Sequence, residues 1–133
     1  MAGYSGTPLA TKLGLAEGMR VALLDTPADL VLDLPPNVTV TRRARGQADV
    51  VLAFFTGRAK LARRVDALAQ MVFPAGGLWI AWPKRASGVV TDMTDDAVRG
   101  VALRKGLVDN KVCAVDATWS ALRLVWRREN RVG

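Results

Sequence analysis

The side chains best suited to chemistry follow two apolar runs of strand length. Thr56, Gly57 and Arg58 come directly after the first run, residues 49–55. The second run, residues 77–82, ends at Trp82, and after Pro83 comes a short basic loop made of Lys84, Arg85, Ala86, Ser87 and Gly88. Hydroxyl groups, backbone amides and basic side chains together bind oxyanions. The two segments therefore predict an anion-binding site, with Trp82 as a wall against which a ring stacks.

Thr26 belongs to the same prediction, because it follows a third apolar run, residues 20–25. Ligands of open parallel sheets bind at the carboxyl ends of the strands, where the strand order reverses. The alternative is that Lys84 and Arg85 are solvated loop charges and that Ser87 and Gly88 only form a turn. For Trp82 the alternative is packing in the core.

The composition excludes the commonest catalytic groups. The chain has no histidine and a single cysteine, Cys113. Histidine-dependent nucleophilic catalysis, histidine-containing zinc sites and all-cysteine zinc sites are therefore excluded within one chain. Three carboxylates, Asp92, Asp95 and Asp96, could bind a metal ion, but their place at a helix start explains them more simply. We therefore expect no metal site, no cofactor is implied, and a non-enzymatic role is favoured.

The glycine-rich loops of cofactor-binding proteins are also absent. No glycine occurs between Asp25 and Leu32, where a dinucleotide fingerprint or the cofactor loop of a methyltransferase would stand. Arg42 and Arg43 end the next apolar segment in place of the acidic residue that would hold a ribose. An arginine there suits a 2′-phosphate, although a surface arginine is the simpler interpretation.

The charge and hydropathy of the chain limit its partners. The net charge is +7 and the sequence pI is about 10.5, which favours phosphorylated small molecules or nucleic acid. The basic residues are spread along the chain, so ordinary surface charge is an equal alternative. No apolar run approaches the ~20 residues of a membrane span, and the N-terminus lacks signal-peptide features. We expect a cytoplasmic protein with no membrane partner.

The elements that would position these residues alternate along the chain. Strands are predicted at residues 20–25, 38–42, 49–55, 77–82, 111–115 and 121–127, and helical segments at 7–14, 26–33, 57–72 and 94–106. This order predicts one α/β domain over residues 1–133, a three-layer Rossmann-like sandwich with a mostly parallel sheet of about six strands. The last two strands are too close in sequence for a parallel connection, so they form an antiparallel hairpin. That hairpin is similar to the one that closes the sheet of Rossmann-type methyltransferases. The polar tail, residues 128–133, is expected to fray.

Three segments resemble the signatures of one protein family. They are residues 3–14 (GYSGTPLATKLG), residues 78–92, which include LWIAWPKRASG, and residues 106–125 (GLVDNKVCAVDATWSALRLV). The chain resembles a group of small bacterial proteins, common in high-GC genomes, that is defined as domain of unknown function 3052. The resemblance implies no particular activity, but it places the basic loop inside a family signature.

Three functions follow from these observations. The first is a non-catalytic or regulatory binding domain for an anionic ligand, either a nucleotide-like molecule or nucleic acid. The alternative is a methyltransferase-like Rossmann enzyme with a degenerate cofactor loop, which predicts a pocket for S-adenosylmethionine beside Asp25. The third is a structural or interaction protein that acts through contacts in a homodimer or with RNA, using the exposed face of residues 121–127.

Overall fold

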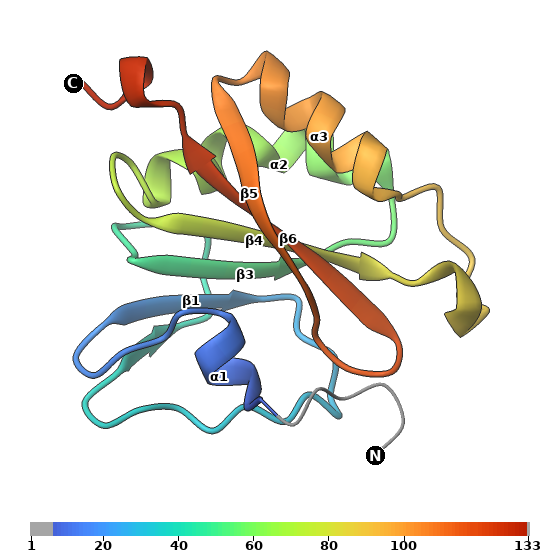
Figure 1. Cartoon of the computed structure of the whole chain (residues 1–133), viewed down its shortest axis with the longest axis horizontal. Helices are drawn as coiled ribbons and strands as arrows, with labels where there is room; N and C mark the ends of the chain where they lie inside the picture. Colours follow the sequence, from blue (N-terminus) through green and yellow to red (C-terminus); the bar gives the residue numbers. More distant parts are fainter. Residues whose placement is uncertain (1–6, 133) are drawn as a thin grey trace.

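The computed structural model describes residues 7–132 and consists of one twisted sheet with helices on its faces (Figure 1). The six strands are β1 (Arg20–Leu24), β2 (Thr39–Thr41), β3 (Val50–Phe54), β4 (Gly77–Pro83), β5 (Leu107–Ala114) and β6 (Trp119–Trp126). Their order in the sheet is β2-β1-β3-β4-β6-β5. The first four strands are parallel, and β6 is antiparallel to both β4 and β5. The predicted α/β fold with a C-terminal hairpin is therefore confirmed.

The two central strands are covered on both sides. Every residue of β3 and β4 is buried, as their continuous apolar sequences predict. In β6 the side chains alternate: Leu122 and Leu124 join one core cluster, whereas Ala121 joins the other. The sheet is thus packed on both faces along its central strands.

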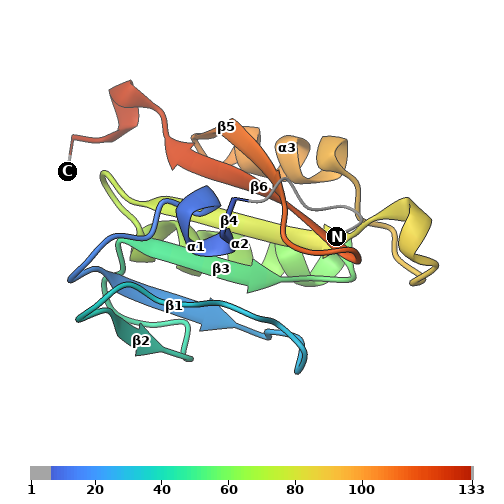
Figure 2. The same cartoon turned by 60° about the horizontal axis from the view of Figure 1, so that its bottom comes forward.

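Helices α2 (Arg58–Met71) and α3 (Asp95–Arg104) cover one face, and the short α1 (Leu9–Lys12) covers the other (Figures 1 and 2). Leu61, Val65 and Leu68 of α2 are fully buried at helical spacing. The predicted start of α3 is confirmed, because Thr94 Oγ1 accepts a hydrogen bond from Ala97 N at 3.0 Å. These helices fix the loops at the carboxyl ends of β3 and β4.

The predicted helical segment 26–33 is wrong. No helix lies between β1 and β2 in the structure, and that stretch is irregular. Leu30 and Leu32 pack against the α1 face of the sheet, while Val31 between them is 77% exposed. Inward residues two apart require an extended backbone, so the contacts of Leu30 and Leu32 with the sheet replace a helix here. Much of this face is therefore covered by a loop.

Both ends of the chain differ from expectation in detail. Helix α1 begins after Pro8 rather than after a capping threonine, although Gly14 (φ +77°) terminates it as predicted. In the tail, Arg128–Asn130 form a turn, and Asn130 Nδ2 donates to Gly106 O at 3.1 Å. Residues 3–6 of the first family signature and Gly133 of the tail lie outside the described residues. Strand β5 begins at Leu107, four residues before the prediction, because a register shift between Asp109 and Lys111 breaks its alternation.

Helices in the described part of the chain are too short or too polar to cross a bilayer.

Candidate functional site

The strand order reverses between β1 and β3, which is where open α/β sheets bind ligands. Asp25 directly follows β1 with a left-handed backbone (φ +55°). Lys60 Nζ, in the first turn of α2, lies 3.6 Å from Asp25 Oδ2, and both side chains are about half exposed. An exposed ion pair of this kind contributes only about 0–1 kcal/mol to stability, so exchanging partners has a low cost. The switch point therefore presents an anion and a cation side by side.

A hollow opens at the next residue, as the methyltransferase-like interpretation predicts. Thr26 Oγ1 accepts a hydrogen bond from Arg42 Nη1 at 3.0 Å, which joins the ends of β1 and β2. The hollow, of about 370 Å³, is lined by Leu23, Thr26, Pro27, Ala28, Leu30, Leu32, Leu34, Val40 and Arg42. It combines an apolar lining with a hydroxyl group and a guanidinium, which suits a ring carrying polar substituents.

The amino terminus of α2 is held by a carboxylate of the protein itself. Gly57 is its N-cap residue, and the predicted cap by Thr56 is not formed. Instead, Arg58 N donates to Asp92 Oδ1 at 2.8 Å, and Thr91 Oγ1 donates to Thr56 O at 2.6 Å. The backbone amide expected to bind an external anion is thus engaged with Asp92.

The basic loop is largely tied to its surroundings. Lys84 Nζ donates to Asp116 O at 2.8 Å, in the turn of the β5–β6 hairpin. Ser87 Oγ donates to Lys84 O at 2.6 Å, and Gly88 (φ +78°) ends the short turn Arg85–Ser87. Among the predicted loop residues, Arg85 remains exposed, beside a hollow of about 390 Å³.

Trp82 also lines that hollow, but it is only 7% exposed and packs in the core with α2 and α3. Most of its ring surface is covered, so packing describes it better than a stacking wall. The structure connects the two predicted halves of the site through Thr91 and Asp92. It does not place their basic groups around a common open cavity in the part of the chain that is described.

The three acidic residues Asp92, Asp95 and Asp96 have two different structural roles. Asp92 caps α2, whereas Asp95 and Asp96 accept hydrogen bonds from Arg99 Nη1 at 3.0 and 3.4 Å. The Arg99 hydrogen bond holds the pKa of Asp95 below its ordinary value. These contacts explain the carboxylates as helix-start and capping groups.

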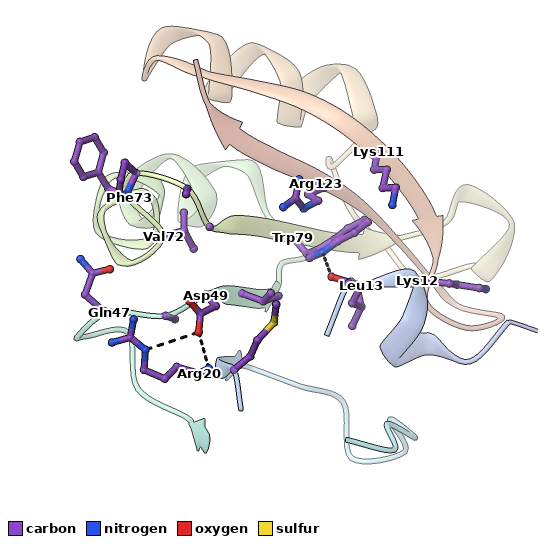
Figure 3. A pocket seen from close by; sticks show the side chains of 17 residues that line it. Lys12, Leu13, Arg20, Gln47, Asp49, Val72, Phe73, Trp79, Lys111 and Arg123 are labelled. Carbon is purple, nitrogen blue, oxygen red and sulfur yellow. Dashed lines mark hydrogen bonds and ion pairs between the residues drawn. The ribbon is translucent and has the colours of Figure 1, made fainter. Parts of the chain in front are cut away.

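A larger cavity lies at the opposite edge of the sheet, beside the amino ends of β1, β3 and β4 (Figure 3). It encloses about 560 Å³ and includes Arg123, whose pKa is lowered by burial. Sequence reasoning missed it, since it expects ligands at carboxyl ends. No signal in the sequence marks it, because the contact between Arg123 and Gly77 arises only when β4 and β6 pair.

The nearby thiol of Cys113 is half-buried, and burial raises its pKa although Lys12 and Lys111 act in the opposite direction. It packs beside the core cluster on the α1 face. This agrees with the structural role expected for it.

No protein-family model matches the chain, and no curated protein sequence is significantly similar to it. Solved structures are similar. An S-adenosylmethionine-dependent methyltransferase from Aquifex aeolicus superposes with a TM-score of 0.61 at 15% identity, covering 87% of this chain and 86% of that one. Magnesium protoporphyrin IX methyltransferase from Synechocystis gives 0.57 at 10% identity, with 90% and 74% covered. The CcbJ methyltransferase from Streptomyces caelestis gives 0.55 at 11% identity, with 92% and 91% covered.

The fold is that of Rossmann-like methyltransferases. At these identities the likeness concerns the fold alone.

Proposed function

We propose that this chain is a methyltransferase-type Rossmann domain that binds a ligand of the S-adenosylmethionine class over the carboxyl ends of β1 and β3. The observation that carries the proposal is the Asp25–Lys60 pair, 3.6 Å apart, next to an apolar hollow. A nucleoside joined to an amino acid has one end that is zwitterionic and one that is a flat ring. The carboxyl edge offers the Asp25–Lys60 pair for the zwitterionic end and the apolar hollow for the ring.

The side chains fit the two ends of such a ligand. The Asp25 carboxylate would accept from the ammonium group, and Lys60 would donate to the carboxylate. The ring would lie in the hollow beside Thr26, with the Arg42 guanidinium available for stacking. When bound, S-adenosylmethionine supplies a transferable methyl group; the residues of this chain bind and orient it. The fit does not extend to the ribose, because Arg42 stands where an acidic residue would hold its hydroxyl groups.

Isothermal titration calorimetry with S-adenosylmethionine tests the proposal. We expect wild-type protein to bind, and Asp25→Asn and Lys60→Met each to weaken binding about tenfold, since each removes one charge-assisted contact. Glu17→Gln is the control, because Glu17 is exposed and lies outside the hollow. No binding by the wild type, or equal binding by all variants, would refute the proposal.

A second candidate ligand is a phosphorylated nucleoside, which the Thr26–Arg42 hydrogen bond favours. Arginine at the end of the second strand suits a phosphate on the ribose. Adenosine 2′-monophosphate would then bind more tightly than S-adenosylmethionine. Arg42→Gln would abolish that preference, whereas Asp25→Asn would leave the affinity for adenosine 2′-monophosphate nearly unchanged. The opposite pattern supports the S-adenosylmethionine class.

A further inference from the structure

The cavity at the amino edge of the sheet is separate from the proposed ligand edge. It lies on the α1 face, where the end of α1 approaches the starts of β1, β3 and β4 (Figure 3). At about 560 Å³ it exceeds both hollows at the carboxyl edge. A cavity of this size accommodates a small organic molecule.

The charges that line the cavity are unbalanced. The cavity is lined by four cationic residues, Lys12, Arg20, Lys111 and Arg123, and by one carboxylate, Asp49. That carboxylate is already engaged by Arg20, whose backbone N donates to it at 2.8 Å and whose Nε lies 3.8 Å away. Lys12 Nζ donates to Ala114 O at 3.2 Å. Within residues 7–132, Arg123 and Lys111 have no hydrogen-bond or ion-pair partner.

Arg123 is held in place by its packing. Its guanidinium lies against Gly77 of β4, where a Cβ atom would meet Arg123 Nε at 2.5 Å. A glycine at this position lets the guanidinium lie on the strand. Partial burial lowers the pKa of the Arg123 guanidinium, and no acidic side chain among residues 7–132 offsets that effect.

Lys111 and Arg123 stand on directly paired positions of β5 and β6. Figure 3 shows both on the hairpin side of the cavity, across from Asp49 and Arg20. Paired residues of an antiparallel sheet are about 5 Å apart at Cα, so one phosphate group can contact both side chains.

Apart from Gln47 and the charged side chains, the side chains that line the cavity are apolar. Trp79 is fully buried below it, with its indole N–H donating to Leu13 O at 3.1 Å, so the ring is fixed. Met19, Val72, Phe73 and Pro74 also line the cavity. A ligand that fits would carry an apolar body as well as an anionic group.

We propose that this cavity binds a small organic phosphate monoester, with its phosphate on Arg123 and Lys111 and its apolar body toward Met19 and Pro74. The dianionic charge matches the two unpaired cations, and the guanidinium offers two parallel donors. The site is independent of the function proposed for the carboxyl edge.

Calorimetry with phenyl phosphate tests this inference. We expect the wild type to bind, Arg123→Gln and Lys111→Gln each to lose at least tenfold in affinity, and Arg104→Gln to be unchanged. Arg104 is the matched control because it is exposed on α3, across the sheet, without a partner in residues 7–132. If Arg123→Gln does not fold, Arg123→Lys keeps the charge, loses the paired donors, and should still weaken binding severalfold.

The test is completed by measuring the affinities of two further ligands and the phenyl phosphate affinity of one further variant. Inorganic phosphate and benzoate should both bind more weakly than phenyl phosphate, the first for lack of an apolar body and the second for lack of a second charge. Equal binding of either, no binding of phenyl phosphate, or full binding by Arg123→Gln would each overturn it. Asp25→Asn should leave phenyl phosphate affinity unchanged, so that failure here is distinct from failure at the carboxyl edge.

Discussion

The carboxyl and amino edges of the parallel strands use their charged groups in different ways. At the carboxyl edge the Arg58 backbone amide donates to Asp92 and Lys84 donates to the Asp116 carbonyl, while the side chains of Arg58 and Arg85 are exposed to solvent. At the amino edge, Arg123 is half-buried and has no acidic partner within residues 7–132. Within residues 7–132, the carboxyl edge thus has an exchangeable ion pair, Asp25–Lys60, and guanidiniums exposed to solvent, whereas the unpaired guanidinium of the amino edge is half-buried.

This difference shows why a strand, a basic loop and a helix do not by themselves make an anion site. A helix amino terminus binds whichever carboxylate the chain supplies, and here Asp92 comes from 34 residues further along. A loop lysine likewise donates to the nearest free carbonyl. Only the folded arrangement shows which positive groups lack such partners.

The largest expected effect concerns the packing that holds Arg123. Gly77→Ala places a methyl group where the Arg123 guanidinium lies, and because this end of the flexible side chain can shift, the expected cost is about 1 kcal/mol, the low end of overpacking. Urea unfolding measures the loss. In an Arg123→Ala background the same change should cost much less, because the obstructing group is gone.

Gly100→Ala is the control for this experiment. Gly100 lies in α3 with open space at its Cβ position, so alanine should stabilise the helix by up to about 1 kcal/mol. A Gly77→Ala variant as stable as the wild type would contradict the packing described for the amino edge.

The next effect concerns Asp92 at the carboxyl edge. Asp92→Ala removes the carboxylate from the start of α2, and loss of a cap costs about 0.5–2 kcal/mol. Thermal unfolding in phosphate buffer should recover part of the loss, since an external anion can take the vacated position. Asp33→Ala, which changes an exposed carboxylate, should show neither the loss nor the recovery. Recovery in the control as well would mean that phosphate acts nonspecifically.

A smaller effect concerns Cys113 near the amino edge. Because burial raises the pKa of its thiol, alkylation by iodoacetamide near neutral pH should be slower than for an unperturbed cysteine, and the rate should keep rising at higher pH. Lys111→Gln should raise the pKa further, because it removes a nearby positive charge. A rate that already levels off near neutral pH would show that the neighbouring lysines outweigh burial.

The smallest effect is the acid dependence of the Asp95–Arg99 pair. The pKa of Asp95 is lower in the folded protein than its ordinary value, so its contribution is complete above that value and disappears as pH falls through the folded pKa. The difference in unfolding free energy between wild type and Asp95→Asn should therefore shrink in acid. It should be slight at any pH, because the pair is exposed to solvent. A difference that grows in acid would contradict the pairing.

Much of the fold was predictable because it depends on local patterns. The continuous apolar runs indicated β3 and β4, and Thr94 with its following acids indicated α3. The segment after β1 was wrongly predicted to be helical, because Leu30 and Val31 fit one face of a helix. In the structure Leu30 and Leu32 pack against the sheet instead, and Val31 is exposed.

The sites were less predictable because they depend on long-range partners. Asp92 and Arg58 are 34 positions apart, and Lys84 and Asp116 are 32 apart. No local pattern reports such pairs. Likewise, Arg123 gains significance only because Gly77 lies against it.

The most direct test of the contrast between the edges is a map of backbone amide shifts by nuclear magnetic resonance, recorded during separate titrations with phenyl phosphate and S-adenosylmethionine. We expect phenyl phosphate to shift amides around Gly77, Lys111 and Arg123, and S-adenosylmethionine to shift those around Asp25, Thr26 and Lys60. The two sets should not overlap. Phenyl phosphate shifts centred on residues 57–58 and 84–88, with the amino edge unchanged, would contradict the account.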